Sequence, residues 1–147
     1  MAEGGGTSTR TILTPPPGAA TILAVDDDPR VLRVLARQLG RLGYRVLQAE
    51  DGASALRVLE AAVSIDALVT DVTMRGGMTG VDLALRAREA RPGLAVVLTS
   101  GYADPELLRQ QSGTVWLPKP YAAADLEGAI LAALGGGAPG AGSAPAA

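Results

Sequence analysis

Short apolar runs alternate along the chain with longer segments in which apolar residues recur at helical spacing. Each run is too short for a typical helix and rich in Val, Ile and Leu, which is typical of strands buried on both faces of a parallel sheet. Strands are predicted over Thr21–Val25, Tyr44–Ala49, Ile65–Asp71, Leu94–Thr99 and Thr114–Leu117. The third of these ends in a lone acid, Asp71, and we expect the other elements to be organised around it.

Helical patterns lie between the runs. Asp28 followed by Pro29 is a typical helix start, and the apolar face that follows ends near Gly43. Further helices are predicted from Asp51-Gly52 through Leu59, and over Val81–Arg91, Pro105–Gln111 and Ala122–Leu134. This alternation predicts an α/β domain with a doubly wound five-stranded parallel sheet in the order 2-1-3-4-5.

The ends of the chain differ from its middle. Residues 1–20 and 135–147 consist mainly of Gly, Ala, Pro, Ser and Thr, so we expect disordered tails around one domain over residues 21–134. The chain has a formal charge of -2, 3% aromatic residues, no cysteine and no apolar run of membrane-spanning length. We therefore expect a cytoplasmic protein that binds neither nucleic acid nor membrane.

Acidic residues end two strands that the predicted order makes neighbours. Asp26 and Asp27 follow the first strand and Asp71 ends the third, so all three should meet at the carboxyl edge of the sheet. The alternative is that Asp26 and Asp27 only start the next helix, but Asp28 already fills that role. Carboxylates roughly 5 Å apart repel by about 3 kcal/mol at an effective dielectric of about 20. Either a shared proton or a cation is required, and oxygen ligands that also meet phosphate favour Mg²⁺.

The fourth and fifth strands bring a hydroxyl and an ammonium to the same edge. Thr99 and Ser100 are the competing hydroxyls at the end of the fourth strand. Lys119 follows the fifth strand and is the only lysine in a chain whose other cations are arginines. A compact ammonium on a flexible stem suits a partner for Asp71 at rest and for phosphate afterwards. We therefore predict that Asp71 is a nucleophile that accepts a phosphoryl group.

The motifs at this edge resemble those of the receiver domains of two-component response regulators, including chemotaxis regulators. The resemblance covers residues 21–134 and rests on four motifs in order, which are Ile22–Asp28, Thr70–Met74 with Gly76–Gly80, Leu98–Tyr102 and Lys119–Tyr121. It implies the flavodoxin-like (βα)5 fold and a phosphorelay in which Asp71 takes phosphate from a histidine kinase or a phosphotransfer protein.

Individual roles follow from the same resemblance. It implies that Asp26, Asp27, Asp71 and the Thr73 backbone carbonyl hold Mg²⁺. Ser100 would be the switch hydroxyl and Lys119 the phosphate partner, with a cis bond before Pro120. Trp116, unless it is plain core, and Tyr102 would respond to phosphorylation. In this family, the residues two positions after the acceptor and two after the switch hydroxyl flank the attacking water. This chain has Thr73 and Tyr102 there, which offer no acid or amide to orient the water, so we expect slow self-dephosphorylation.

Some features depart from the family pattern or favour one branch of it. Arg75 stands where proline usually follows the methionine, and the span from Ser100 to Lys119 is short, which places the usual signalling surface in question. The Ser-Gly-Tyr segment at residues 100–102 and the loop over Gly76–Gly80 resemble receiver modules of hybrid sensor kinases.

We therefore expect a stand-alone receiver that signals by protein contact or relay and that catalyses only its own phosphorylation and dephosphorylation. Two rivals remain. One is an Mg²⁺-dependent phosphatase of the haloacid dehalogenase type, whose second acid lies two residues after the nucleophile, where this chain has Thr73. The other is a pseudo-receiver that binds a partner without being phosphorylated.

Overall fold

A five-stranded parallel sheet forms the centre of the computed structural model, which describes residues 19–61, 64–74, 76–101 and 113–135. The strands are β1 (Thr21–Val25), β2 (Arg45–Ala49), β3 (Ala67–Asp71), β4 (Ala95–Ser100) and β5 (Thr114–Pro118). Their order is β2-β1-β3-β4-β5, and every pairing is parallel. This arrangement confirms the predicted doubly wound sheet.

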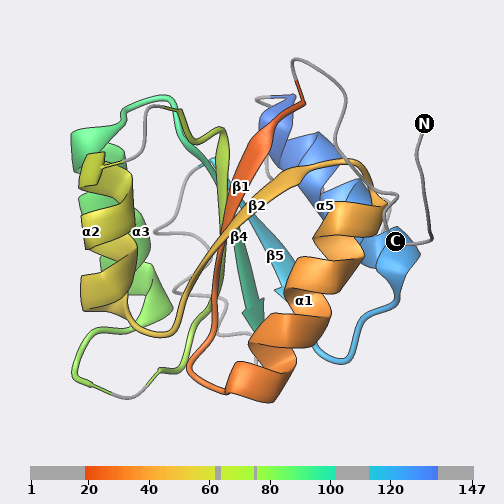
Figure 1. The fold of residues 1–147 in the computed structure, drawn as a ribbon, viewed down its shortest axis with the longest axis horizontal. Helices are drawn as coiled ribbons and strands as arrows, with labels where there is room; N and C mark the ends of the chain where they lie inside the picture. Colours follow the sequence, from red (N-terminus) through yellow and green to blue (C-terminus); the bar gives the residue numbers. More distant parts are fainter. Residues whose placement is uncertain (1–18, 62–63, 75, 102–112, 136–147) are drawn as a thin grey trace, which may run out of the picture.

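Helices cover both faces of the sheet. On one side lie α1 (Pro29–Arg41) and α5 (Ala123–Leu134), and on the other lie α2 (Gly52–Ala61) and α3 (Gly80–Ala90) (Figure 1). The predicted start of α1 is present, because the Asp28 carboxylate accepts a hydrogen bond of 2.9 Å from the Arg30 amide and Pro29 is the first helical residue. Gly43 follows the end of this helix with a φ of +97°, a conformation that favours glycine.

Apolar side chains on the central strands point alternately to the two helical layers. In β1, Ile22 and Ala24 pack with α1 and α5, whereas Leu23 and Val25 pack with α2 and α3. All four are fully buried. Because both faces are covered, the ends of the strands are the places where these segments meet solvent. In a doubly wound sheet of this order, a ligand site is expected at the carboxyl ends of the strands.

The observed bounds differ slightly from the predicted ones. Strand β4 extends by one residue to Ser100, which pairs with Pro118 of β5. The predicted helix over Pro105–Gln111, most of the two predicted tails, Arg75 and Tyr102 lie outside the described residues. Within the described part of the chain, no helix is both long and apolar enough to cross a membrane.

Candidate functional site

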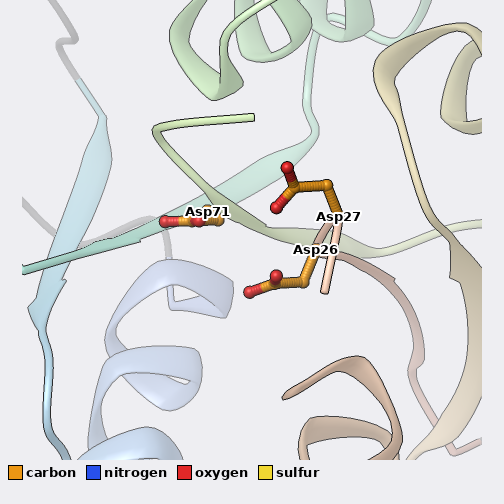
Figure 2. A group of neighbouring side chains, drawn as sticks. All are labelled: Asp26, Asp27 and Asp71. Atoms are coloured by element: carbon orange, nitrogen blue, oxygen red, sulfur yellow. The ribbon is translucent and has the colours of Figure 1, made fainter. Parts of the chain in front are cut away.

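Three carboxylates meet at the carboxyl edge of the sheet, as the predicted topology requires. Asp26 and Asp27 follow β1, and Asp71 ends the neighbouring strand β3 (Figure 2). One oxygen from each carboxylate lies within 4.8 Å of the other two. Residues that are 45 positions apart in sequence, Asp26 and Asp71, therefore belong to one cluster because β1 and β3 are paired.

Asp26 is the most deeply buried member of the cluster, with 3% of its surface exposed. Its Oδ1 accepts a hydrogen bond of 2.9 Å from the Asp28 amide, and its own amide donates to the Ala49 carbonyl. These bonds fix the turn between β1 and α1, so Asp26 presents its second oxygen, Oδ2, to the other groups of the site.

Lys119 provides the positive charge of the site. Its Nζ lies 3.4 Å from Asp26 Oδ2 and 3.5 Å from Asp71 Oδ1, so one ammonium bridges the two acids. The backbone after β5 directs it there, since the Lys119 amide donates a 2.8 Å hydrogen bond to the Ser100 carbonyl. The bond between Lys119 and Pro120 is cis, as the resemblance implied.

The surroundings of Asp71 alter its acidity. Burial raises the pKa of the Asp71 carboxyl, the Lys119 ammonium lowers it, and the Asp26 carboxylate raises it again, with a net upward shift. A backbone amide, that of Thr73, also donates to the carboxylate and favours its charged form. Asp71 therefore carries a carboxyl group whose ionisation depends on the charged groups around it.

The donor set fits a hard divalent cation. Three carboxylates and one ammonium leave two uncompensated negative charges in a small, partly buried space. All three side chains of this cluster offer carboxylate oxygens as ligands. Mg²⁺ prefers oxygen ligands, whereas softer metals prefer nitrogen or sulfur. Asp26, Asp27 and Asp71 would hold it, and the part of the Thr73 carbonyl stays a prediction.

Two hydroxyls lie at the end of β4, on opposite faces of the sheet. Thr99 is 2% exposed and pairs in register with Asp71, whereas Ser100 is 6% exposed and pairs with Pro118. Both side chains therefore end at the acidic cluster's edge of the sheet. The assignment of Ser100 as the switch hydroxyl stays a prediction.

Two aromatic residues of the β5 region differ in their relation to the site. Trp116 is partly buried against the apolar cluster of the α2–α3 face, so its predicted movement stays a prediction. Tyr121 was not among the predicted site residues, yet burial raises the pKa of its hydroxyl, and the Asp26 and Asp71 carboxylates add to that rise. Its position directly after Lys119-Pro120 is the sequence feature that could have identified Tyr121 as a neighbour of the site.

The raised pKa of Asp71 predicts a pH-dependent stability difference. A carboxyl whose pKa is raised in the folded state stabilises the fold below its unfolded value of 3.8, and that contribution is lost as the pH rises through the folded pKa. Without Mg²⁺, the unfolding free energy of wild type should therefore fall relative to that of Asp71→Asn as the pH rises from 3.8 to 7. Denaturant unfolding of both proteins measures this difference, and parallel pH profiles would oppose the assignment.

Comparison with protein families places this site in a known context. The family model for the response regulator receiver domain matches residues 22–131. The response regulator receiver protein CpdR of Brucella abortus (strain 2308) is 36% identical over 110 residues, which cover 71% of this chain and 88% of that protein. The transcriptional regulatory protein GlrR of Escherichia coli (strain K12) is 35% identical over 104 residues, 69% of this chain, but the match spans only 23% of GlrR.

Solved structures agree with the sequence relatives. The receiver domain of the hybrid histidine kinase CckA is 36% identical with a TM-score of 0.66, over 78% of this chain and 99% of that one. A response regulator receiver protein from Sinorhizobium medicae WSM419 is 31% identical with a TM-score of 0.74, over 80% and 96% of the two chains. The resemblance inferred from the motifs is thereby confirmed, and the chain belongs to the response regulator receiver domain family of two-component systems.

Proposed function

We propose that this receiver domain accepts a phosphoryl group on the carboxylate of Asp71. The observation that carries the proposal is the ammonium of Lys119, which bridges Asp71 and Asp26 within a cluster of three carboxylates. An acid whose side chain is only 14% exposed, with a countercharge and two further acids beside it, has the parts that phosphoryl transfer requires, a nucleophile and compensation for added negative charge.

The step would proceed as an in-line displacement. An oxygen of Asp71 attacks the phosphorus of a phosphohistidine, the phosphorus–nitrogen bond breaks, and the imidazole nitrogen keeps the electron pair. Lys119 lies close enough to Asp71 to move from the carboxylate to the new phosphoryl oxygens. A bound Mg²⁺ would supply positive charge to those oxygens.

The phosphodonor is expected to be a sensor histidine kinase or a histidine phosphotransfer protein. Relatives of this chain include the sensor kinase CckA of Brucella abortus and the sensor histidine kinase RcsC of Salmonella typhimurium. Phosphorylation would bias a pre-existing conformational equilibrium through Ser100 and Lys119, and a protein partner would read the result. Slow self-dephosphorylation remains a prediction, because neither Thr73 nor Tyr102 offers an acid or an amide to orient the attacking water.

The two rival functions differ in what they require. A haloacid dehalogenase-type phosphatase needs a second acid two residues after the nucleophile, and Thr73 is an exposed threonine there. A pseudo-receiver would not need a complete set of acids with a lysine, whereas this site has Asp26, Asp27, Asp71 and Lys119 together. The phosphoacceptor function therefore agrees best with the residues present.

Incubation with acetyl phosphate tests the proposal without the need for a cognate kinase. With MgCl₂ present, we expect the protein to gain one phosphoryl group that is labile to hydroxylamine, as an acyl phosphate is. Addition of EDTA should prevent the gain, because the acids are then left without a divalent cation. Absence of any incorporation under these conditions favours the pseudo-receiver, and continuous turnover of a phosphate ester favours the phosphatase.

A further inference from the structure

The backbone that leaves β3 passes very close to the first residue of α3. A Cβ atom added to Gly80 would collide with the carbonyl oxygen of Asp71 and would lie 2.9 Å from the Cα of Val72. These are backbone atoms, which cannot turn aside as the end of a flexible side chain can. Only glycine fits at position 80 while Asp71 stays where it is.

Hydrogen bonds hold the same stretch from two sides. The amide of Gly80 donates to the Val72 carbonyl at 2.8 Å, and the amide of Val72 donates to the Thr99 carbonyl of β4 at 2.9 Å. The residue that follows Asp71 is therefore fixed between α3 and β4. Since β4 is buried in the sheet, the position of Val72 depends on where the first turn of α3 lies.

The first turn of α3 is itself held in place. Thr79 caps the helix, because its hydroxyl accepts from the Asp82 amide and the Asp82 carboxylate accepts from the Thr79 amide, both at 3.1 Å. The preceding residue, Met78, packs its side chain directly against Gly52 at the start of α2. The position of the turn is thus determined by contacts on both sides of Gly80.

We propose that Gly80 is a positioning residue for the acceptor, and that the close contact between the first turn of α3 and the end of β3 sets where the Asp71 carboxylate stands relative to Lys119. The inference rests on the proposed function, because it assigns a role in phosphoryl transfer to a residue outside the acidic cluster. A displacement of about 1 Å at a reacting group is enough to slow a reaction considerably.

Three glycine-to-alanine variants form a graded test. Gly80→Ala introduces a backbone collision, Gly52→Ala meets only the flexible Met78 side chain, and Gly93→Ala adds a methyl group where no atom lies within 4 Å. We expect phosphorylation by acetyl phosphate to slow roughly tenfold or more in Gly80→Ala, less in Gly52→Ala, and not at all in Gly93→Ala. Rates are compared at a temperature where circular dichroism shows each variant folded.

A second readout separates positioning from stability. The ¹³C resonance of the Asp71 carboxyl in the metal-free protein should shift in Gly80→Ala and stay unchanged in Gly93→Ala, whereas a purely structural role would change only the melting temperature. Suppose that wild type and Gly93→Ala are both phosphorylated. If Gly80→Ala is folded and has the same rate and the same Asp71 resonance as these two proteins, the inference is wrong. If wild type itself takes no phosphate, it is the proposed function that fails.

A milder pair of variants applies if Gly80→Ala does not fold. Thr79→Ala removes the cap of α3, and Asp125→Ala removes the carboxylate that accepts from the Ala122 amide at the start of α5. Each variant loses one hydrogen bond at the start of its helix, so both should have a lower melting temperature than wild type. Only Thr79→Ala should slow phosphorylation and shift the Asp71 resonance, and equal behaviour of the two variants would overturn the inference.

Discussion

Replacing Asp71 by asparagine should abolish phosphorylation by acetyl phosphate. The amide matches the carboxylate in size and fits the same partly buried position at the end of β3, but it lacks the anionic oxygen that attacks phosphorus. Loss of a covalent nucleophile reduces a rate on the order of 10³-fold or more. Incorporation of phosphate, followed by intact-protein mass spectrometry, should therefore fall to background.

A neighbouring acid provides the matched control. Glu50 is exposed and lies with Asp27 along the same pocket, yet it is not a member of the three-carboxylate cluster. Glu50→Gln removes the same charge from the same region and should keep the wild-type rate. Phosphorylation of Asp71→Asn at a comparable rate would mean that another residue is the acceptor.

Replacing Lys119 by methionine is expected to slow phosphorylation roughly 10²-fold, the usual cost of removing one preorganised donor from a developing anion. Burial raises the pKa of Asp71, and the Lys119 ammonium opposes that rise. Removal of the ammonium therefore favours the protonated carboxyl, which cannot attack. In the absence of Mg²⁺, the loss of its charged hydrogen bond to Asp26 should also destabilise the fold by about 1–3 kcal/mol. Rate and unfolding measurements on one preparation give both numbers.

Lys119→Arg separates charge from shape. Arginine keeps the positive charge but replaces a compact ammonium by a planar fork, so we expect the stability to be largely retained while the rate stays well below that of wild type. A wild-type rate in Lys119→Met would remove the lysine from the mechanism. A full rate in Lys119→Arg would show that only its charge matters.

The sequence predicts the sheet and the acidic cluster well because both depend on short, strong signals. Strands buried on both faces are continuous apolar runs, so β1, β3 and β4 are recognisable without knowledge of their neighbours. Once the strand order is inferred, parallel pairing brings Asp26 and Asp71 to one edge. Lys119 can be identified from the sequence because it is the only lysine in the chain and because it follows the predicted fifth strand.

Other features depend on distances that no periodicity encodes. The contact of Gly80 with the Asp71 backbone follows from how tightly α3 packs against the end of β3, and in the sequence Gly80 reads only as the last residue of a glycine-containing loop. The strand limits shifted for a similar reason, since Ser100 joins β4 through its pairing with Pro118. The hydrophobic pattern predicts the fold, but strand limits and close backbone contacts depend on tertiary packing that the pattern does not contain.

The most direct test of the central claim is chemical identification of the modified residue. Reduction of an acyl phosphate with borohydride converts the phosphorylated aspartate to homoserine, which mass spectrometry locates in a peptide. After treatment with acetyl phosphate and Mg²⁺, we expect homoserine at position 71 alone. Homoserine at position 26 or 27, or an unmodified residue 71 in a protein that has gained phosphate, would contradict the assignment of Asp71 as the phosphoacceptor.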